Sequence, residues 1–254
     1  MRAALELALL ELRARRGRLL ALAAFATVFL AAGAAARLLV ADGDGHVDAD
    51  QLFIIGGYPL VSALLLLGWL LGRFPLIATL VLLAGIVSGD RGAGYARIYA
   101  VRPTSPLAVY GVRFLVLAAT AFVLCAVLLP TFDLLLLGTW AGPATLVLIL
   151  ANILAFGGLV TFLSACTRAD AWIALFLAIS ALVWNALRAA GKLTIPIGVR
   201  DFISFLLPPQ AALLRLEGAF GTLQPIPWDA FWLVAGYGLV LLAAAVIVLR
   251  HREL

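Results

Sequence analysis

The sequence predicts an all-α integral membrane protein with six transmembrane helices, on the basis of its composition, its long apolar stretches and the placement of its charges. Of its 254 residues, 65% are hydrophobic and 12% are charged, whereas a soluble domain carries roughly 45–50% apolar and about 25% charged residues. Several apolar stretches reach the length of about 20 residues that a helix needs to cross a bilayer. The net charge is +5. The basic residues lie at the ends of apolar stretches, where they orient membrane spans, and not in a patch suited to nucleic acid.

Residues 1–18 are predicted to form an amphipathic helix at the membrane interface. Leu5, Leu9 and Leu12 recur at helical spacing near one face, and the charged residues fall elsewhere. The alternative is that this segment extends the first span, residues 19–40, into the cytoplasm. That span has no convincing cleavage site, so we expect it to stay in the membrane and not to be removed as a signal peptide.

The acidic loop 41–51 follows the first span and matches part of a calcium-binding loop. Asp42 and Asp44 fit two of the ligand positions, but Val40 and Gln51 occupy the first and last positions, which need Asp and Glu. We therefore expect a solvated acidic loop on the outer side and no metal site.

The second span is predicted over residues 52–88, a stretch too long for one ideal crossing and too short for two comfortable ones. One long helix, bent near Pro75, keeps both termini on the same side, whereas two short spans would place them on opposite sides. With six spans in all, the inner segments hold twelve basic and five acidic residues, and the outer segments hold five basic and eight acidic residues. This positive-inside asymmetry favours one span and places both termini in the cytoplasm.

Four glycines and one arginine stand out in this second span. Gly68 and Gly72, and likewise Gly85 and Gly89, have the GxxxG spacing that permits close helix packing. They are therefore candidates for packing against a second copy of the chain. Arg73 is the only clear charge away from a span end. We expect it to contact outer lipid headgroups, with a role in a pathway or a dimer as the alternative.

A polar elbow, residues 89–106, joins the second span to the third. Pro130 and Asp133 are predicted to begin an outer turn after the third span. Residues 188–227 mix charges and prolines with apolar stretches, which predicts short interfacial or re-entrant helices on the outer face. The remaining spans are predicted at residues 107–129, 144–165, 171–187 and 228–249.

The sequence contains no recognisable catalytic or cofactor-binding motif. His46 and His251 have no metal-ligand partner at useful spacing, and Cys125 and Cys166 are interpreted as small packing residues. No P-loop, GxSxG or HExxH motif is present. We therefore expect no enzymatic activity of the chain itself, no cofactor in it, no nucleic-acid partner and the lipid bilayer as its surroundings. No relay of Asp, Glu and His appears in the spans, so the energy for any transport would have to come from elsewhere.

The elbow has a distinctive order of residues. An acidic residue, a basic residue and a glycine are followed by a basic residue, a proline and a serine, and a further basic residue opens the third span. These residues are Asp90, Arg91, Gly94, Arg102, Pro103, Ser105 and Arg113. Together with six spans, an N-terminal amphipathic helix and outer re-entrant helices in the same order, this arrangement resembles the permease subunits of type 2 ABC transporters. Segments 163–184 and 206–216 and the C-terminal tail are similar to the same family.

Three elbow residues depart from the family pattern. Gly92 stands where a second acidic residue is usual, Tyr95 replaces a small hydroxyl residue, and Pro106 replaces a basic residue. These departures put specific elbow contacts in doubt more than the fold.

The resemblance implies that the elbow is a cytoplasmic coupling helix that docks in a cleft of an ATPase. It implies an exporter in the inner (cytoplasmic) membrane, built from two identical or homologous permease copies and two cytoplasmic ABC ATPase subunits that bind ATP and Mg²⁺. The implied coupling residues are Asp90, Arg91, Gly94, Arg97, Arg102, Pro103 and Ser105.

Two other readings of the chain remain open. One is a structural or regulatory membrane subunit with no transport of its own, and the other is a membrane enzyme acting on lipid. The enzyme is the weakest because no set of nucleophile, base or metal ligands emerges. For Asp90 and Arg91 the alternative to coupling is that they only cap and anchor a helix end.

Overall fold

All regular elements that the computed structural model describes are α-helices. The described residues are 2–40, 70, 72–92, 106–137, 140, 142–191, 195–222 and 225–252. Among these described residues, six helical segments are long and apolar enough to cross a membrane, or seven if the bent pair α10–α11 forms one span. The prediction of an all-helical chain with six candidate spans is therefore confirmed. The helices are α1 (Arg2–Ala14), α2 (Arg16–Val40), α4 (Phe74–Leu83), α5 (Ser88–Gly92), α7 (Pro106–Leu137), α8 (Ala144–Cys166), α9 (Asp170–Ala189), α10 (Ile197–Leu206), α11 (Gln210–Thr222) and α12 (Trp228–Arg252).

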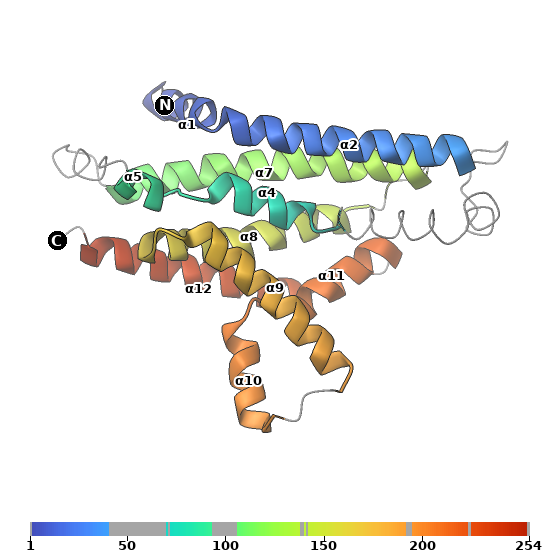
Figure 1. Cartoon of the computed structure of the whole chain (residues 1–254). Coiled ribbons are helices and arrows are strands. Elements are labelled where there is room, and N and C mark those ends of the chain that lie inside the picture. The colour runs from blue at the N-terminus through green and yellow to red at the C-terminus, as the bar shows by residue number, and fades with distance from the viewer. Residues whose placement is uncertain are drawn as a thin grey trace.

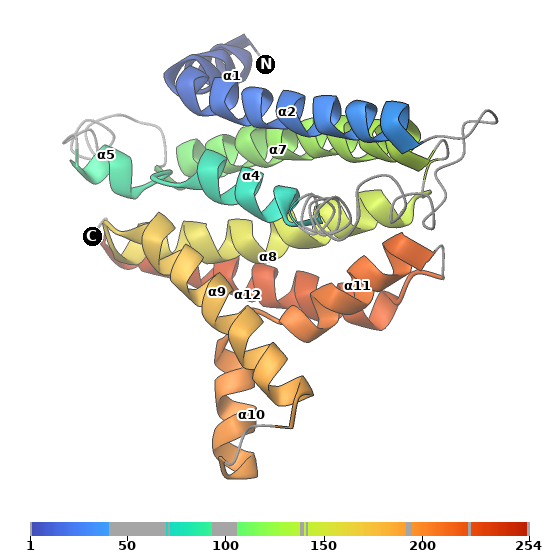
Figure 2. The ribbon, with the colours of Figure 1, turned by 45° about the vertical axis from the view of Figure 1, so that its right-hand side comes forward.

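The helices pack around α8, which is the most buried of the candidate spans, with 72% of its apolar window inside the protein. Helices α2 and α7 lie on one side of α4 and α8, and α9, α11 and α12 lie on the other (Figures 1 and 2). Two apolar clusters fill the spaces between them. One cluster is centred on Phe29, Phe74 and Leu129, and the other on Phe156, Leu213 and Val234. Helix α8 is apolar on all sides, as expected of a helix surrounded by others.

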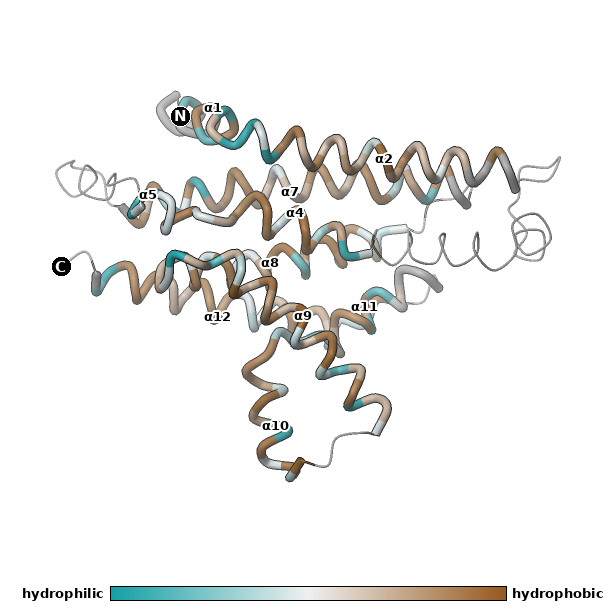
Figure 3. Tube along the Cα trace, in the orientation of Figure 1, coloured by the Kyte–Doolittle hydropathy of each residue, from teal (hydrophilic) through white to brown (hydrophobic). Residues whose placement is uncertain are grey.

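The outer helices turn large apolar side chains away from the protein. Leu20, Val123, Phe176 and Trp232 are all exposed, each on a different helix. The hydropathy colouring shows the same helices as mostly apolar over their length (Figure 3). Such a surface is unfavourable in water but is what lipid requires of a spanning helix.

Helices α8 and α12 touch through their backbones at two glycines. A Cβ atom built on Gly238 would lie 2.1 Å from the carbonyl oxygen of Leu154, and one built on Gly158 would lie 2.3 Å from the carbonyl oxygen of Gly238. Only residues without a side chain allow this approach, as in other membrane helix pairs. The sequence prediction concerned other glycines and their packing against a second copy of the chain, and it stays a prediction.

Helix α7 extends further than expected. The outer turn was predicted to begin at Pro130, but α7 continues through this proline to Leu137, and Asp133 is buried. A proline removes one backbone hydrogen bond, which membrane helices tolerate when neighbouring groups compensate. The apolar residues after Asp133 favour continuation of the helix over a turn.

Arg73 does not point to lipid headgroups. Its side chain is buried and forms an ion pair with Glu217 of α11. The expectation that it reaches the outer surface was therefore wrong, because the sequence alone did not reveal an acidic partner nearly 150 residues away.

Helix α1 is separate from α2. The two meet at Arg15, and α1 turns away from the axis of α2 and packs against α7 (Figures 1 and 2). It therefore does not simply extend the first span.

Helix α10 projects from the side of the bundle with α9 (Figures 1 and 2), and none of its residues is buried. It meets α11 at an angle of 66°, at Pro208 and Pro209, which cannot continue a helix. The location of both helices at the outer membrane face stays a prediction. The acidic loop 41–51 and residues 52–69 lie outside the described residues, so whether residues 52–88 cross the membrane once or twice stays open.

Candidate functional site

The second span is interrupted at residues 84–87, between α4 and α5. Gly85 in this break has φ = +74°, a left-handed backbone conformation that glycine adopts without steric cost. The break leaves backbone carbonyls at the end of α4 and N–H groups at the start of α5 without helical partners. Inside a membrane protein, such groups must be satisfied by other parts of the chain.

Two arginines at the start of the first span bind the carbonyls at the end of α4. The Arg15 Nη1 donates to the carbonyl oxygen of Ala84 at 2.8 Å and also to that of Leu82. The Arg18 Nη1 donates to the carbonyl oxygens of Ala84, at 2.6 Å, and Val81, at 3.1 Å. Positive charge at the C-terminal end of a helix is also favoured by the helix dipole.

Two buried side chains accept the N–H groups on the other side of the break. The Asp170 Oδ2 accepts from the Gly85 N–H at 2.8 Å and from the Ser88 hydroxyl at 3.1 Å. The Ser164 Oγ accepts from the N–H groups of Val87, at 3.0 Å, and Ser88, at 2.9 Å. Both acceptors come from the end of α8 and the start of α9, so the break is held from both sides.

A chain of charges continues from the break to the start of the elbow. Asp90 pairs with Arg113 of α7, and Arg113 also pairs with Glu11 of α1 at 3.1 Å. Glu11 in turn pairs with Arg15 at 2.8 Å. The Arg91 Nη1 donates to the carbonyl oxygen of Ala165 at 2.6 Å. Each charge therefore has a partner, which partly buried charges require.

We call this set the polar junction: the break at 84–87 with the side chains of Glu11, Arg15, Arg18, Ser88, Asp90, Arg91, Arg113, Ser164 and Asp170. It joins α1, α2, α4, α5, α7, α8 and α9 at one end of the bundle. The start of α1 and the end of α12 lie at the same end of the bundle as α5 (Figure 1). The contacts of Ser88, Asp90 and Arg91 hold α5 against α7, α8 and α9, while Arg15 and Arg18 hold the end of α4.

Of the predicted coupling residues, the structure describes only Asp90 and Arg91. Both lie in the polar junction and contact α7 and α8, so in this chain they position α5. Gly94, Arg97, Arg102, Pro103 and Ser105 lie outside the described residues, and their coupling role stays a prediction.

The structure describes three of the four glycines that were predicted to pack closely, namely Gly72, Gly85 and Gly89. Gly85 and Gly89 are separated by the break, so they do not share the face of one continuous helix. Added Cβ atoms at Gly72 and Gly89 would meet no described atom within 4 Å. These positions are therefore not used for packing between the described helices, and Gly68 lies outside the described residues.

Sequence reasoning missed most of the partners in the junction, namely Glu11, Arg15, Arg18, Ser164 and Asp170. Their common signal is position: each is polar and stands at or within ten residues of a span end that is predicted to be cytoplasmic. Gly85 stands inside an apolar run near the same end. A glycine that breaks a span needs polar partners at the same depth, which is how these residues could have been connected.

The described residues contain no cluster of three or more histidine, cysteine or acidic side chains that could hold a metal ion. The junction is an arrangement of mutual ion pairs and hydrogen bonds. No family model, curated protein or solved structure matches the chain.

Proposed function

We propose that this chain is the membrane-spanning permease subunit of an ATP-driven exporter of the type 2 ABC kind. In this proposal two permease copies form the path across the inner membrane. Cytoplasmic ATPase subunits bind ATP and Mg²⁺ and act on the elbow. The end of the bundle that holds the polar junction faces the cytosol, in keeping with its arginines.

The observation that supports this proposal best is the way the junction connects the elbow to the bundle. Asp90 and Arg91 stand at the start of the elbow and are bound to α7 and α8. The same network reaches α1 through Arg113 and Glu11 and α9 through Asp170, and Arg18 of α2 binds the end of α4 at the same break. A displacement imposed on the elbow would therefore reach most of the spans at once and not one helix alone.

The physical logic of coupling follows from this connection. ATP favours one arrangement of an ATPase pair, and a ligand can shift a conformational equilibrium only through such a difference in affinity. Rigid helices joined at a common polar network can transmit that bias as a rigid-body movement. The chain has no nucleotide-binding motif of its own, so in this proposal the nucleotide is bound by the partner.

The first test is purification from native membranes in a mild detergent, with identification of the proteins that remain bound. We expect an ATPase subunit of the ABC class in the complex. A stable, folded preparation that never contains such a subunit would overturn the proposal.

The second test measures ATP hydrolysis by the complex against that of the isolated ATPase subunit. Gly94→Leu and Pro103→Gly are expected to abolish the difference between the two while leaving the thermal stability of the complex unchanged. Arg168→Gln is the matched control. Arg168 is exposed near the same end of the bundle, outside the elbow. Hydrolysis that is unaffected by both elbow variants would count against the coupling role, and hydrolysis that no candidate substrate stimulates would favour a membrane subunit without transport.

A further inference from the structure

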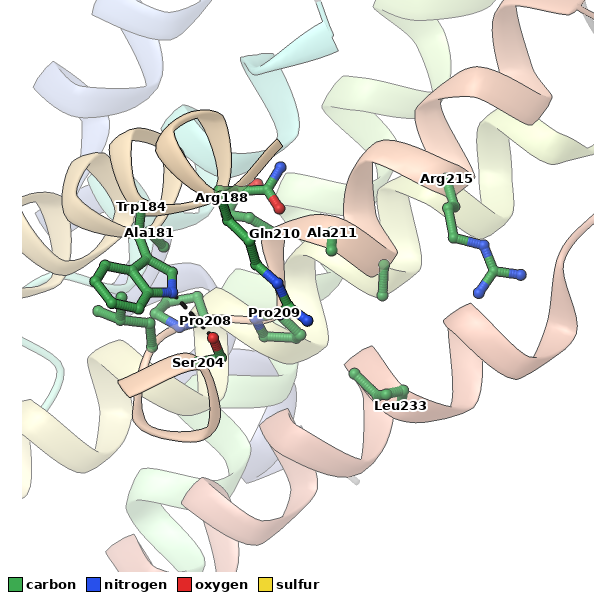
Figure 4. Close-up of a pocket in the computed structure, with 13 residues that line it drawn as sticks. Ala181, Trp184, Arg188, Ser204, Pro208, Pro209, Gln210, Ala211, Arg215 and Leu233 are labelled. Atoms are coloured by element: carbon green, nitrogen blue, oxygen red, sulfur yellow. Dashed lines mark hydrogen bonds between the residues drawn. The ribbon is translucent and has the colours of Figure 1, made fainter. Parts of the chain in front are cut away.

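A cavity of about 270 Å³ lies between α9, α10, α11 and α12, away from the polar junction. Its volume is slightly below the range of about 300–1,000 Å³ that is usual for small-molecule sites. Trp184, Arg188, Ser204 and Gln210 lie together on one side, and Leu233 lies on the other (Figure 4). The cavity therefore combines a polar wall with an apolar one.

Gln210 is the most unusual residue of this cavity. Its side chain is only 2% exposed, and neither its amide nitrogen nor its amide oxygen has a hydrogen-bond partner. A buried amide without partners is costly, and nearly all buried polar groups in native proteins are paired. Both amide atoms have almost no accessible surface, so a ligand in the cavity would supply their partners after a rotation of the Gln210 side chain.

The polar wall of the cavity also carries positive charge. Arg188 reaches from α9 across Pro209 (Figure 4) and forms no ion pair or side-chain hydrogen bond with any described residue. Arg215, by contrast, is already neutralised by a bidentate pair with Asp229, at 2.7 and 3.1 Å. Helix α11 begins at Gln210, so the positive end of its dipole faces the cavity, although the N–H groups of Gln210, Ala212 and Leu213 already donate to the carbonyls of Pro208 and Pro209.

The rest of the cavity and its surroundings are apolar. Leu207, Pro208 and Leu233 line it. On the neighbouring helix α10, Phe202 and Phe205 are exposed, the latter to 81%. The wall of α10 is fixed against α9 by the Trp184 indole, which donates to the Ser204 hydroxyl at 2.9 Å. A ligand with an anionic head would thus find its charge matched at one wall and an apolar surface beside it.

We propose that this cavity binds the headgroup of an anionic phospholipid that also carries a hydroxyl or amine group. The phosphate lies against Arg188 and the N-terminal end of α11. Once its side chain has rotated toward the cavity, the Gln210 amide donates to a phosphate oxygen through its nitrogen and accepts from the headgroup hydroxyl or amine through its oxygen. The acyl chains lie outside the cavity, along the exposed apolar surface of α10. Neither the elbow nor an ATPase takes part, so the site stands apart from the proposed transport function.

Native mass spectrometry of the purified full chain in a non-ionic detergent tests this site. The added probes are dihexanoyl phosphatidylglycerol, dihexanoyl phosphatidylcholine and glycerol 3-phosphate. We expect saturable binding of phosphatidylglycerol and at least about tenfold weaker binding of the zwitterionic lipid. Equal affinity for glycerol 3-phosphate would assign the site to a soluble phosphate compound and overturn the lipid. Binding of phosphatidylcholine as tight as that of phosphatidylglycerol would overturn the anionic preference.

Two variants and one control separate binding from folding. Arg188→Gln is expected to weaken phosphatidylglycerol binding by at least about tenfold, the effect of losing one charge-assisted hydrogen bond. Gln210→Met is expected to weaken it about fivefold and to keep or raise the melting temperature without lipid, because it removes an unpaired buried amide. The control, Arg200→Gln on α10, removes the same charge outside the cavity and should change binding less than twofold. Unchanged binding in both variants, or a lower melting temperature of Gln210→Met, would overturn the proposal.

Discussion

The contact between α8 and α12 allows the sharpest prediction of stability. In Gly238→Ala the new methyl carbon would lie 2.1 Å from the carbonyl oxygen and 2.4 Å from the carbonyl carbon of Leu154. To bring the first of these contacts to about 3.5 Å, a typical van der Waals separation, the helices would have to separate by about 1.4 Å at this point. Because the atoms that clash are backbone atoms, no side chain can rotate to relieve them.

The cost follows from this geometry. Overpacking of a core typically costs about 1–3 kcal/mol, and we expect the upper end here because the backbone must move. Alanine gains back up to about 1 kcal/mol over glycine in a helix, which leaves a net loss of about 2 kcal/mol. For a chain of this size that corresponds to a fall in melting temperature of about 4–8 °C.

The assay can use a cysteine that the core already contains. Cys125 is fully buried, so in a Cys166→Ser background a thiol-reactive fluorophore reports unfolding as the protein is heated. Gly236→Ala is the matched control, because an added Cβ atom there would meet no described atom within 4 Å. The control should melt at the same temperature as the parent or slightly above it.

Gly158→Ala tests the same contact from the other helix, because its Cβ atom would lie 2.3 Å from the carbonyl oxygen of Gly238. The double variant should lose less free energy of unfolding than the two single variants together, since the first substitution already separates the helices. If Gly238→Ala and Gly158→Ala have the same melting temperature as the control Gly236→Ala, the backbone contact between α8 and α12 is refuted.

Three further predictions concern the break and the buried ion pair. Asp170→Ala should lower the melting temperature by about 2–8 °C, because the Gly85 N–H loses its acceptor at a cost of about 1–2 kcal/mol, while Arg168→Ala in the neighbouring loop should leave it unchanged. Gly85→Ala should be destabilising by about 1–2 kcal/mol, because its φ of +74° disfavours any side chain; unchanged thermal unfolding of this variant would contradict the break. Arg73→Met should cost about 3–5 kcal/mol by leaving Glu217 alone, whereas the double variant with Glu217→Met should recover most of that loss, as a double-mutant cycle in thermal unfolding would show.

The sequence was sufficient to predict the helical class and the number of candidate spans, because both depend on local signals. The length of an apolar stretch indicates a membrane span, and the charged residues on either side of it indicate where the span ends. The same local signals failed inside the spans. The GxxxG spacing of Gly85 and Gly89 is typical of a packing face, but the chain breaks between these residues because Ser164 and Asp170 are there to satisfy the freed backbone groups. That outcome depends on residues about 80 positions away.

Tertiary partners also explain the other differences. Arg73 could not be matched with Glu217 before α4 and α11 were known to be neighbours. Pro130 is a helix breaker by local rules, yet the apolar residues that follow it keep α7 helical. The unpaired amide of Gln210 has no sequence signature, because pairing is a property of the folded surroundings and not of the residue type.

Helix α4 is held at both of its ends, and this has a mechanical consequence. It is ten residues long, a rod of about 15 Å. Arg73 fixes its beginning to α11, and the arginines of the first span grip its end. Separating Arg73 from Glu217 would leave a charge unpaired in an apolar environment. A displacement of α4 that starts at its C-terminal end must therefore move α11 as well, or α11 will oppose it.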